Sequence, residues 1–424
     1  MNYLQFARKN RVMVIFGIIM TALSSFGQTF LLALYVPFLM VEFNLSNGLL
    51  SAFYGLATIG AAMALPKLGK LIDTVPIQKF TMATTVTFVI SLLFFSFSQA
   101  WWYIPIAFFG LRLAGQGLYN HISITSMSRY FDVNRGKAIS LASLGHPLGQ
   151  AILPAIILVV IAKVGWRESL WLNAAIVSIV VTVVTLWVLK PSHLVSESGE
   201  MADTVYAEKK VDRVRQRDIM KSKAFWLLAP NIFFIPYAVT GLFFYQFAII
   251  EFKGWNIGLA AAGLTSYAIA SFFSILLSGP LIDRFKAKTF FPFYLFPLFV
   301  ALFVIWLVPN VWGIFVYNIL MGLSVGFGSA TVASLQVEFF GQTYIGTVRS
   351  LFTSIMVLSS AIGPALFGIF LDVGWGFQTI FPVTIGILVV IMVQSFRAVP
   401  KYSRAKWKFR YKKVTGQKNK IPKP

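Results

Sequence analysis

Arg112 and His146 are the candidates for chemistry among the ionisable side chains that lie inside long apolar stretches of the sequence. A charged or titratable group in such surroundings is costly unless it faces a partner, a cavity or a ligand. Arg112 could bind an anion through its planar fork of N–H donors. His146, whose ordinary pKa is about 6.5, could relay protons. Each could instead be satisfied by neighbouring helices and serve packing alone, so both alternatives stay open.

Further polar side chains accompany Arg112. Gln116 and Tyr119 follow it at spacings that place them within about 40° of its azimuth on an α-helix, at roughly 100° per residue. Such a polar stripe normally faces a water-filled cavity, because lipid cannot satisfy it. The candidate binding residues on other apolar stretches are Gln28, Tyr35, Asn231, Tyr237 and Tyr245.

Acidic side chains are missing from the interior of every apolar stretch, so the deep charge is positive. Since a desolvated cation favours an opposite charge beside it, the sequence favours a small organic anion, such as a carboxylate, as the ligand. The chain has no Cys and only 3 His. We therefore expect no metal site and no cofactor, and the absence of paired carboxylates or a nucleophile argues against an enzyme.

The composition indicates that these stretches lie in lipid. In 424 residues, hydrophobic types make up 58% and charged types 12%, and the mean hydropathy is +0.77. A soluble domain carries about 25% charged residues, so this chain is too apolar to cover itself in water. We predict an all-α membrane protein with twelve transmembrane helices at 12–40, 47–66, 79–99, 102–128, 137–162, 168–189, 224–250, 256–278, 289–308, 311–335, 346–371 and 376–396.

The net charge of +22 predicts the orientation of these helices. Nearly all Lys and Arg residues lie at the chain ends or in the loops that follow the second, fourth, sixth, eighth and tenth predicted helices. The exceptions are Arg112, Lys163, Arg167 and Lys253. Positive loops stay on the cytoplasmic side, so both termini are predicted to be cytoplasmic and the protein to lie in the cytoplasmic membrane.

A polar stretch at 190–223 divides the predicted helices into two groups of six, at 1–189 and 224–398, and reads as a cytoplasmic linker. The basic tail at 399–424 follows the last helix directly. We expect it to contact anionic lipid headgroups rather than nucleic acid. A specific partner for the tail is the alternative.

The two halves repeat each other in sequence. A shift of 210 residues aligns Gly69-x-Leu71-Ile72-Asp73 with Gly279-x-Leu281-Ile282-Asp283, and Tyr35 with Tyr245. Two six-helix bundles of the same orientation are then related by an axis along the membrane normal. This geometry suits a transporter that rocks one bundle against the other around a central site.

On these motifs the chain resembles the major facilitator superfamily over almost its whole length. The stretch GKLIDTVPIQK at 69–79 is similar to the family signature G-x-x-x-D-R-x-G-R-K, although only Gly69, Asp73 and Lys79 keep it. The copy at 279–288 keeps the glycine, both charges of the Asp-Arg pair and the final lysine. The segment around Gly145-His146-Pro147 is loosely similar to the fifth helix of proton-driven exporters and carboxylate porters. The resemblance implies alternating access, with helices 1, 4, 7 and 10 lining the cavity.

The aspartates of the two copies lie in short loops that are otherwise dominated by cations. A carboxylate there can cap a helix N-terminus and pair with arginine, which would favour one arrangement of the bundles. The alternative is a tight turn in which Gly and Asp serve turn chemistry alone. The expected gating set is Gly69, Asp73, Arg135, Gly279, Asp283, Arg284 and Arg349.

Together these observations favour a secondary active transporter, a monomer that moves a small organic anion by alternating access, with proton coupling as an option. A proton-driven exporter of drugs or other amphipathic solutes is the alternative. A transporter-like sensor is a third reading.

Overall fold

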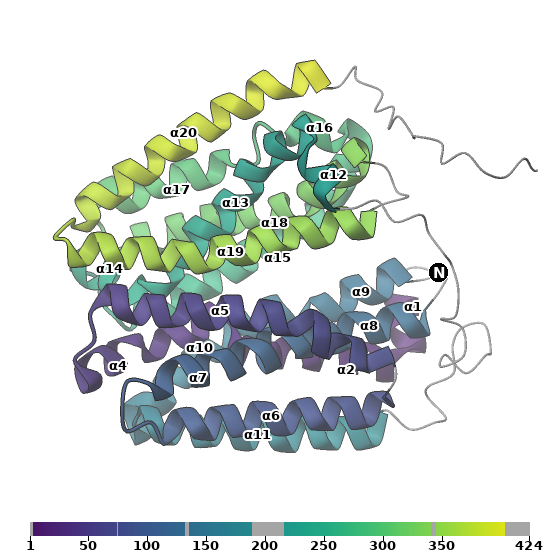
Figure 1. Ribbon diagram of the computed structural model, residues 1–424, viewed down its shortest axis with the longest axis vertical. Coiled ribbons are helices and arrows are strands. Elements are labelled where there is room, and N and C mark those ends of the chain that lie inside the picture. The colour runs from purple at the N-terminus through teal and green to yellow at the C-terminus, as the bar shows by residue number, and fades with distance from the viewer. Residues whose placement is uncertain (1–2, 74, 132–134, 189–215, 341–344, 403–424) are drawn as a thin grey trace, which may run out of the picture.

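The computed structural model describes residues 3–73, 75–131, 135–188, 216–340 and 345–402, with only the backbone described for some of them. Within these residues every regular element is a helix. Figure 1 shows the helices in two stacked groups, one holding α1 to α11 and the other α12 to α20. The predicted linker at 190–223 and tail at 399–424 fall largely outside the described residues.

The first group begins at the end of the molecule that carries the N-terminus in Figure 1. Its elements are α1 (Tyr3–Lys9), α2 (Arg11–Leu23), η1 (Ser24–Gly27), α3 (Thr29–Leu32), η2 (Ala33–Tyr35), α4 (Val36–Phe43), α5 (Asn47–Gly69), η3 (Lys70–Asp73), α6 (Ile77–Ser96), α7 (Tyr103–Gly110), η4 (Leu111–Tyr119), α8 (Asn120–Tyr130), α9 (Arg135–Ser143), α10 (Gly145–Val164) and α11 (Trp166–Val188).

The second group follows the gap at 189–215. Its elements are α12 (Gln216–Met220), α13 (Lys223–Phe244), α14 (Gln246–Phe252), α15 (Leu259–Phe285), α16 (Ala287–Phe290), α17 (Phe296–Leu307), α18 (Gly313–Phe340), α19 (Ile345–Asp372) and α20 (Phe377–Tyr402).

Nine of the described helices are long and apolar enough to cross a membrane, or ten when the bent pair Arg11–Gly27 and Thr29–Phe43 is taken as one span. The predicted span 102–128 coincides with α7, η4 and α8, and its middle element η4 is a π-helix. The predicted span 289–308 ends in the shorter apolar helix α17. The all-helical, multi-span fold class is therefore confirmed. The count of twelve and the location of the termini stay predictions.

One cation at the end opposite the N-terminus has a clear structural role. Arg167, at the start of α11, forms an ion pair with Glu42 and donates to the carbonyls of Ser96 and Ser98, both at 2.6 Å. The Trp166 indole donates to the same carboxylate at 3.0 Å. This arginine departs from the charge bias of the loops because it ties α4, α6 and α11 together.

The two groups pack on each other mainly through α5 against α19 and through α10 against α15. A hydrogen bond from the Thr265 hydroxyl to the Ala151 carbonyl, at 2.7 Å, also joins α15 to α10. These elements bring the inner helices of both groups to the centre of the molecule, where the candidate site lies.

Candidate functional site

The first predicted span, 12–40, is broken near its middle. After the 3₁₀-helix η1, Gln28 takes an extended conformation (φ −87°, ψ 153°), and helical structure resumes at Thr29 with a bend of 45°. Serine and glycine together are a usual cause of sharp kinks, and residues 24–27 read Ser-Ser-Phe-Gly. Gly27 also lies so close to η4 that a Cβ on it would be 2.6 Å from the Gln116 backbone nitrogen. Irregular backbone at this depth must be enclosed by protein or face a cavity.

Arg112 lies against this break. Its side chain is 3% exposed, and Nη1 donates to the Gly27 carbonyl and the Thr29 hydroxyl at 3.4 Å each. The guanidinium carbon is 5.0 Å from the centroid of the Tyr54 ring. These contacts replace hydration only in part, because Nε has no hydrogen-bond partner in the described structure.

Within the part of the chain that the structure describes, the charge of Arg112 is not balanced by a neighbouring acid. Among the described residues, no carboxylate lies within ion-pair distance of its guanidinium. A buried cation without a counter-ion is expensive, so the electrostatics favour an anion beside it. Arg112 also lies in the π-helical segment η4, and π-helical turns occur frequently at functional sites.

Two further buried polar atoms adjoin the break and have no hydrogen-bond partner among the described residues, namely the Ser25 hydroxyl oxygen and His146 Nδ1. The His146 ring stacks on Phe30, with 6.2 Å between ring centroids. Gly149, one turn further along α10, packs directly on the Ser25 hydroxyl. We call Ser25, Thr29, Arg112 and His146 the break cluster.

The π-helix changes which residues accompany Arg112. The predicted stripe assumed α-helical spacing, whereas a π-helix bonds residue i to i+5 and so alters the register. The Tyr119 hydroxyl donates to Thr85 on α6 at 3.0 Å, and its ring meets Phe88 edge-on, so this side chain is satisfied by packing. Gln116 is half-buried, with its backbone at the close approach of Gly27.

The remaining tyrosines among the candidate binding residues also have partners in the protein. The Tyr35 hydroxyl is 3.1 Å from the Ser169 hydroxyl and accepts from Asn173 Nδ2 at 2.9 Å, within the first group. Tyr237 is buried and meets Phe367 edge-on, with 5.9 Å between centroids. Gln28 is half-buried at the break itself.

Tyr245 joins the two groups at the end opposite the N-terminus. Its hydroxyl donates to the Asn47 carbonyl at 2.9 Å, and the side chain is 1% exposed. The Asp372 carboxylate accepts from the backbone nitrogens of Asn47 and Gly48 at 3.1 and 2.8 Å. We call these four residues the α5–α19 clasp. The role of Asp372 could not be predicted from the sequence, because an acid at the end of a span looks like an ordinary loop residue.

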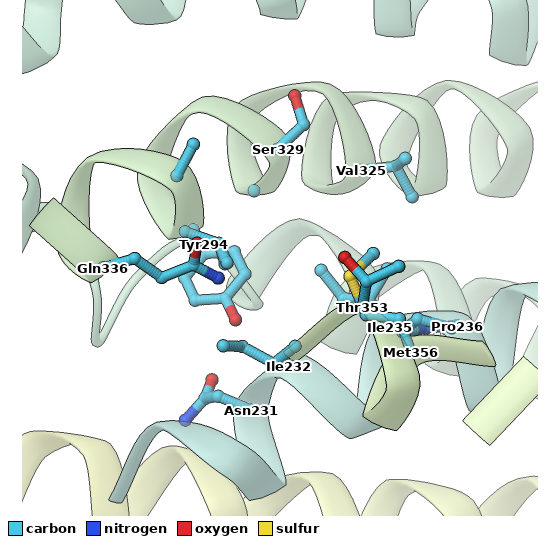
Figure 2. A pocket seen from close by; sticks show the side chains of 13 residues that line it. Asn231, Ile232, Ile235, Pro236, Tyr294, Val325, Ser329, Gln336, Thr353 and Met356 are labelled. Carbon is cyan, nitrogen blue, oxygen red and sulfur yellow. The ribbon is translucent and has the colours of Figure 1, made fainter. Parts of the chain in front are cut away.

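A cavity of about 300 Å³ lies within the second group, lined by α13, α18, α19 and the segment before α17 (Figure 2). Asn231 is the only one of the candidate binding residues that lines it. Its Nδ2 donates to the Ser395 hydroxyl, and its Oδ1 has no partner among the described residues. Tyr294 and Gln336, which sequence reasoning missed, also line this cavity.

The predicted gating set is only partly described. The structure describes only the backbone of five of these residues: Asp73, Arg135, Gly279, Asp283 and Arg349. The Gly69 carbonyl is 3.2 Å from His121 Nε2, and the exposed Arg284 places its guanidinium carbon 5.1 Å from the Phe285 ring centroid. A latch at these loops stays a prediction.

The model of the Major Facilitator Superfamily matches residues 17–266 and 254–420 of the sequence. The chain belongs to the major facilitator superfamily. The resemblance drawn from the repeated loop motif is thereby confirmed, and membership of this superfamily makes the protein a membrane transporter and not an enzyme.

Solved structures of superfamily transporters share this fold. A substituted variant of the nucleoside transporter NupG matches with a TM-score of 0.72 and 12% identity, over 92% of this chain and 99% of that chain. A bacterial homologue of the human lysosomal transporter Spinster, in an inward-facing and occupied conformation, matches with a TM-score of 0.66 and 15% identity. This match covers 93% of this chain and 98% of that chain. At such identities the likeness shows the fold alone. No curated protein sequence matches the chain.

Proposed function

We propose that this superfamily transporter is a secondary active carrier of a small organic anion, and that a carboxylate is the group it recognises. The observation that carries the proposal is Arg112, a guanidinium that is 3% exposed and has no counter-ion among the described residues. Its forked donors match the two oxygens of a carboxylate, and Nε is still without a partner. An anion would therefore supply both the charge and the hydrogen bond that the protein leaves open.

The broken first helix supports the same proposal. In transporters, discontinuous helices supply irregular backbone at the central site, and rocking of the bundles changes the side from which it is reached. Rearrangement at Gln28 would open the contacts of Arg112 with Gly27 and Thr29. His146, with Nδ1 unpaired beside the break, is the candidate for proton coupling.

The test is a thermal-shift panel on the purified full chain with acetate, lactate, succinate, glucose, uridine and a cationic drug. A ligand that binds only the folded state raises apparent stability by RT ln(1 + [L]/Kd), which is about 2.7 kcal/mol at 100 times Kd. We expect at least one carboxylate to raise the apparent Tm and the uncharged and cationic solutes to leave it unchanged. Stabilisation by the cationic drug alone would instead favour an exporter of amphipathic solutes.

The orientation is part of the proposal, because the cations gather at one end of the helices. We propose that the end with the N-terminus is cytoplasmic and that the α5–α19 clasp closes the external side. Epitope tags at the N-terminus, near Ser198 and at the C-terminus should all be reached by antibody only after permeabilisation. A tag that is detected on intact cells would contradict this orientation.

A further inference from the structure

The cavity in the second group presents a hydrogen-bond donor and an acceptor that the protein itself does not use. Asn231 and Tyr294 are 1% and 2% exposed, and neither Asn231 Oδ1 nor the Tyr294 hydroxyl has a hydrogen-bond partner among the described residues. Figure 2 shows the amide oxygen and the hydroxyl directed toward each other from two sides of the cavity. They do not bond to each other, so a single group placed between them would satisfy both.

The orientation of the Asn231 amide follows from its neighbours. The Ser395 hydroxyl donates to the Ile391 carbonyl at 2.7 Å, so its oxygen must accept from the amide. Asn231 therefore presents Nδ2 to Ser395 and keeps Oδ1 as an unused acceptor. A hydroxyl group can serve both sides at once, since it donates to an amide oxygen and accepts from a phenol.

The walls of the cavity determine the charge of what it can hold. Ile232, Val325 and Met356 are among the apolar residues that line it, and Gln336 adds a second buried amide, 5% exposed. No Asp, Glu, Lys, Arg or His is among the described lining residues. Burying a charge in such a site without a partner would be costly, so the group that fits is uncharged.

The size of the cavity argues against a single bridging water. The cavity measures about 300 Å³, whereas one water occupies about 30 Å³ in the liquid. Cavities that hold small ligands begin at about 300 Å³ and combine apolar walls with a few placed polar groups. The observed lining has this character.

We propose that the cavity binds an uncharged hydrogen-bonding group, a hydroxyl or a carboxamide, of the transported solute. The inference rests on the proposed function and deepens it. The substrate would be an organic anion whose polar, uncharged group is well separated from its carboxylate, because Arg112 lies in the first group of helices and Asn231 and Tyr294 lie in the second.

The test uses Tyr294→Phe, which removes only the unpaired hydroxyl. The ring keeps its stacking with Phe291, at 6.1 Å between centroids, so the apparent Tm should not fall. Removing an unsatisfied buried hydroxyl is neutral or stabilising, in contrast to removing one that is bonded. The matched control is Tyr267→Phe, because Tyr267 is buried in the same group of helices and does not line the cavity.

Calorimetric binding is measured for three pairs that differ by one hydroxyl: octanoate with 8-hydroxyoctanoate, dodecanoate with 12-hydroxydodecanoate, and 1-propanol with 1,3-propanediol. We expect the wild type and Tyr267→Phe to prefer a hydroxylated acid by about tenfold, as one or two hydrogen bonds allow. The preference should fall below about twofold in Tyr294→Phe. Equal affinity within every pair in the wild type, or a preference that persists in Tyr294→Phe, would overturn the inference.

The uncharged pair separates this inference from the proposed function. If none of the acids binds, but the diol binds and its advantage over 1-propanol is lost in Tyr294→Phe, the cavity is supported and the anion proposal fails. If the acids bind without any hydroxyl preference, the anion proposal stands and the cavity inference fails. Binding of none of these probes would overturn the inference.

Discussion

Arg112→Gln is expected to reduce the affinity for the transported carboxylate at least about thirtyfold and to abolish measurable uptake into liposomes. Truncating one partner of a buried charge pair costs at least about 2 kcal/mol, which corresponds to this factor. Glutamine is shorter and does not replace the contacts of Nη1 with Gly27 and Thr29, but a buried neutral amide costs less than a buried charge without a counter-ion, so the helices should still pack. Arg112→Lys should restore binding only in part, because an ammonium is a point charge without forked donors.

Binding and uptake measured on one preparation distinguish the roles that Arg112 could have. The control is Lys163→Gln, which removes an exposed cation in the last turn of α10, at the end away from His146, and should leave both measurements unchanged. If Arg112 serves coupling, exchange between solute-loaded sides would survive in Arg112→Gln while accumulation driven by a pH gradient would be lost. Wild-type binding and uptake in Arg112→Gln would show that the arginine only packs, and the anionic substrate would be ruled out with it.

Hydropathy predicted most of the helices because lipid imposes one simple requirement, an uninterrupted apolar run of about 20 residues. Hydropathy contains no information about the backbone hydrogen-bond pattern. It therefore missed the 3₁₀ turn and break between Ser24 and Thr29 and the π-helix from Leu111 to Tyr119. Both irregularities lie at Arg112. The fold class could thus be predicted, whereas the local geometry of the site depended on tertiary contacts such as that of Gly27 with η4.

Some site residues could be identified from the sequence, and others only from the structure. Arg112 and His146 could be found because a titratable group inside a span is visible in the sequence alone. The hydrogen-bond partner of a tyrosine hydroxyl is not visible in the sequence. The hydrogen bonds from Tyr119 to Thr85 and from Tyr245 to the Asn47 carbonyl could therefore not be predicted. Tyr294 was missed for a related reason. An aromatic residue in an apolar span attracts notice only when the structure shows that its hydroxyl has no partner.

The α5–α19 clasp is present only while the two groups meet at the end opposite the N-terminus. Asp372, on α19, places its carboxylate at the first backbone nitrogens of α5, where the partial positive charge of a helix N-terminus favours an anion. Because the two helices belong to different groups, this interaction stabilises the closed arrangement and is lost when the groups separate there. Removing it should shift the population toward the arrangement that is open at this end.

We expect Asp372→Ala to raise the rate at which a buried thiol in this interface reacts with a maleimide by about fivefold. The factor corresponds to about 1 kcal/mol, the usual loss when a helix-capping side chain is truncated to alanine. The chain has no Cys, so Ser51→Cys supplies a single reporter. Ser51 is 0% exposed and lies against Gly368 of α19. The thiol should therefore react only when the clasp opens.

Two comparisons decide whether the carboxylate itself holds the clasp. Asp372→Asn should give an intermediate rate, because an amide oxygen can still accept from Gly48 but carries no charge. Glu251→Ala removes another exposed acid, at the end of α14, for which no contact with α5 is described, and should react like the parent protein. If Glu251→Ala accelerates labelling as much as Asp372→Ala, the effect comes from the general loss of negative charge and not from the cap on α5. If Asp372→Ala leaves the rate unchanged, apolar packing and the Tyr245 hydroxyl hold this end closed without the carboxylate.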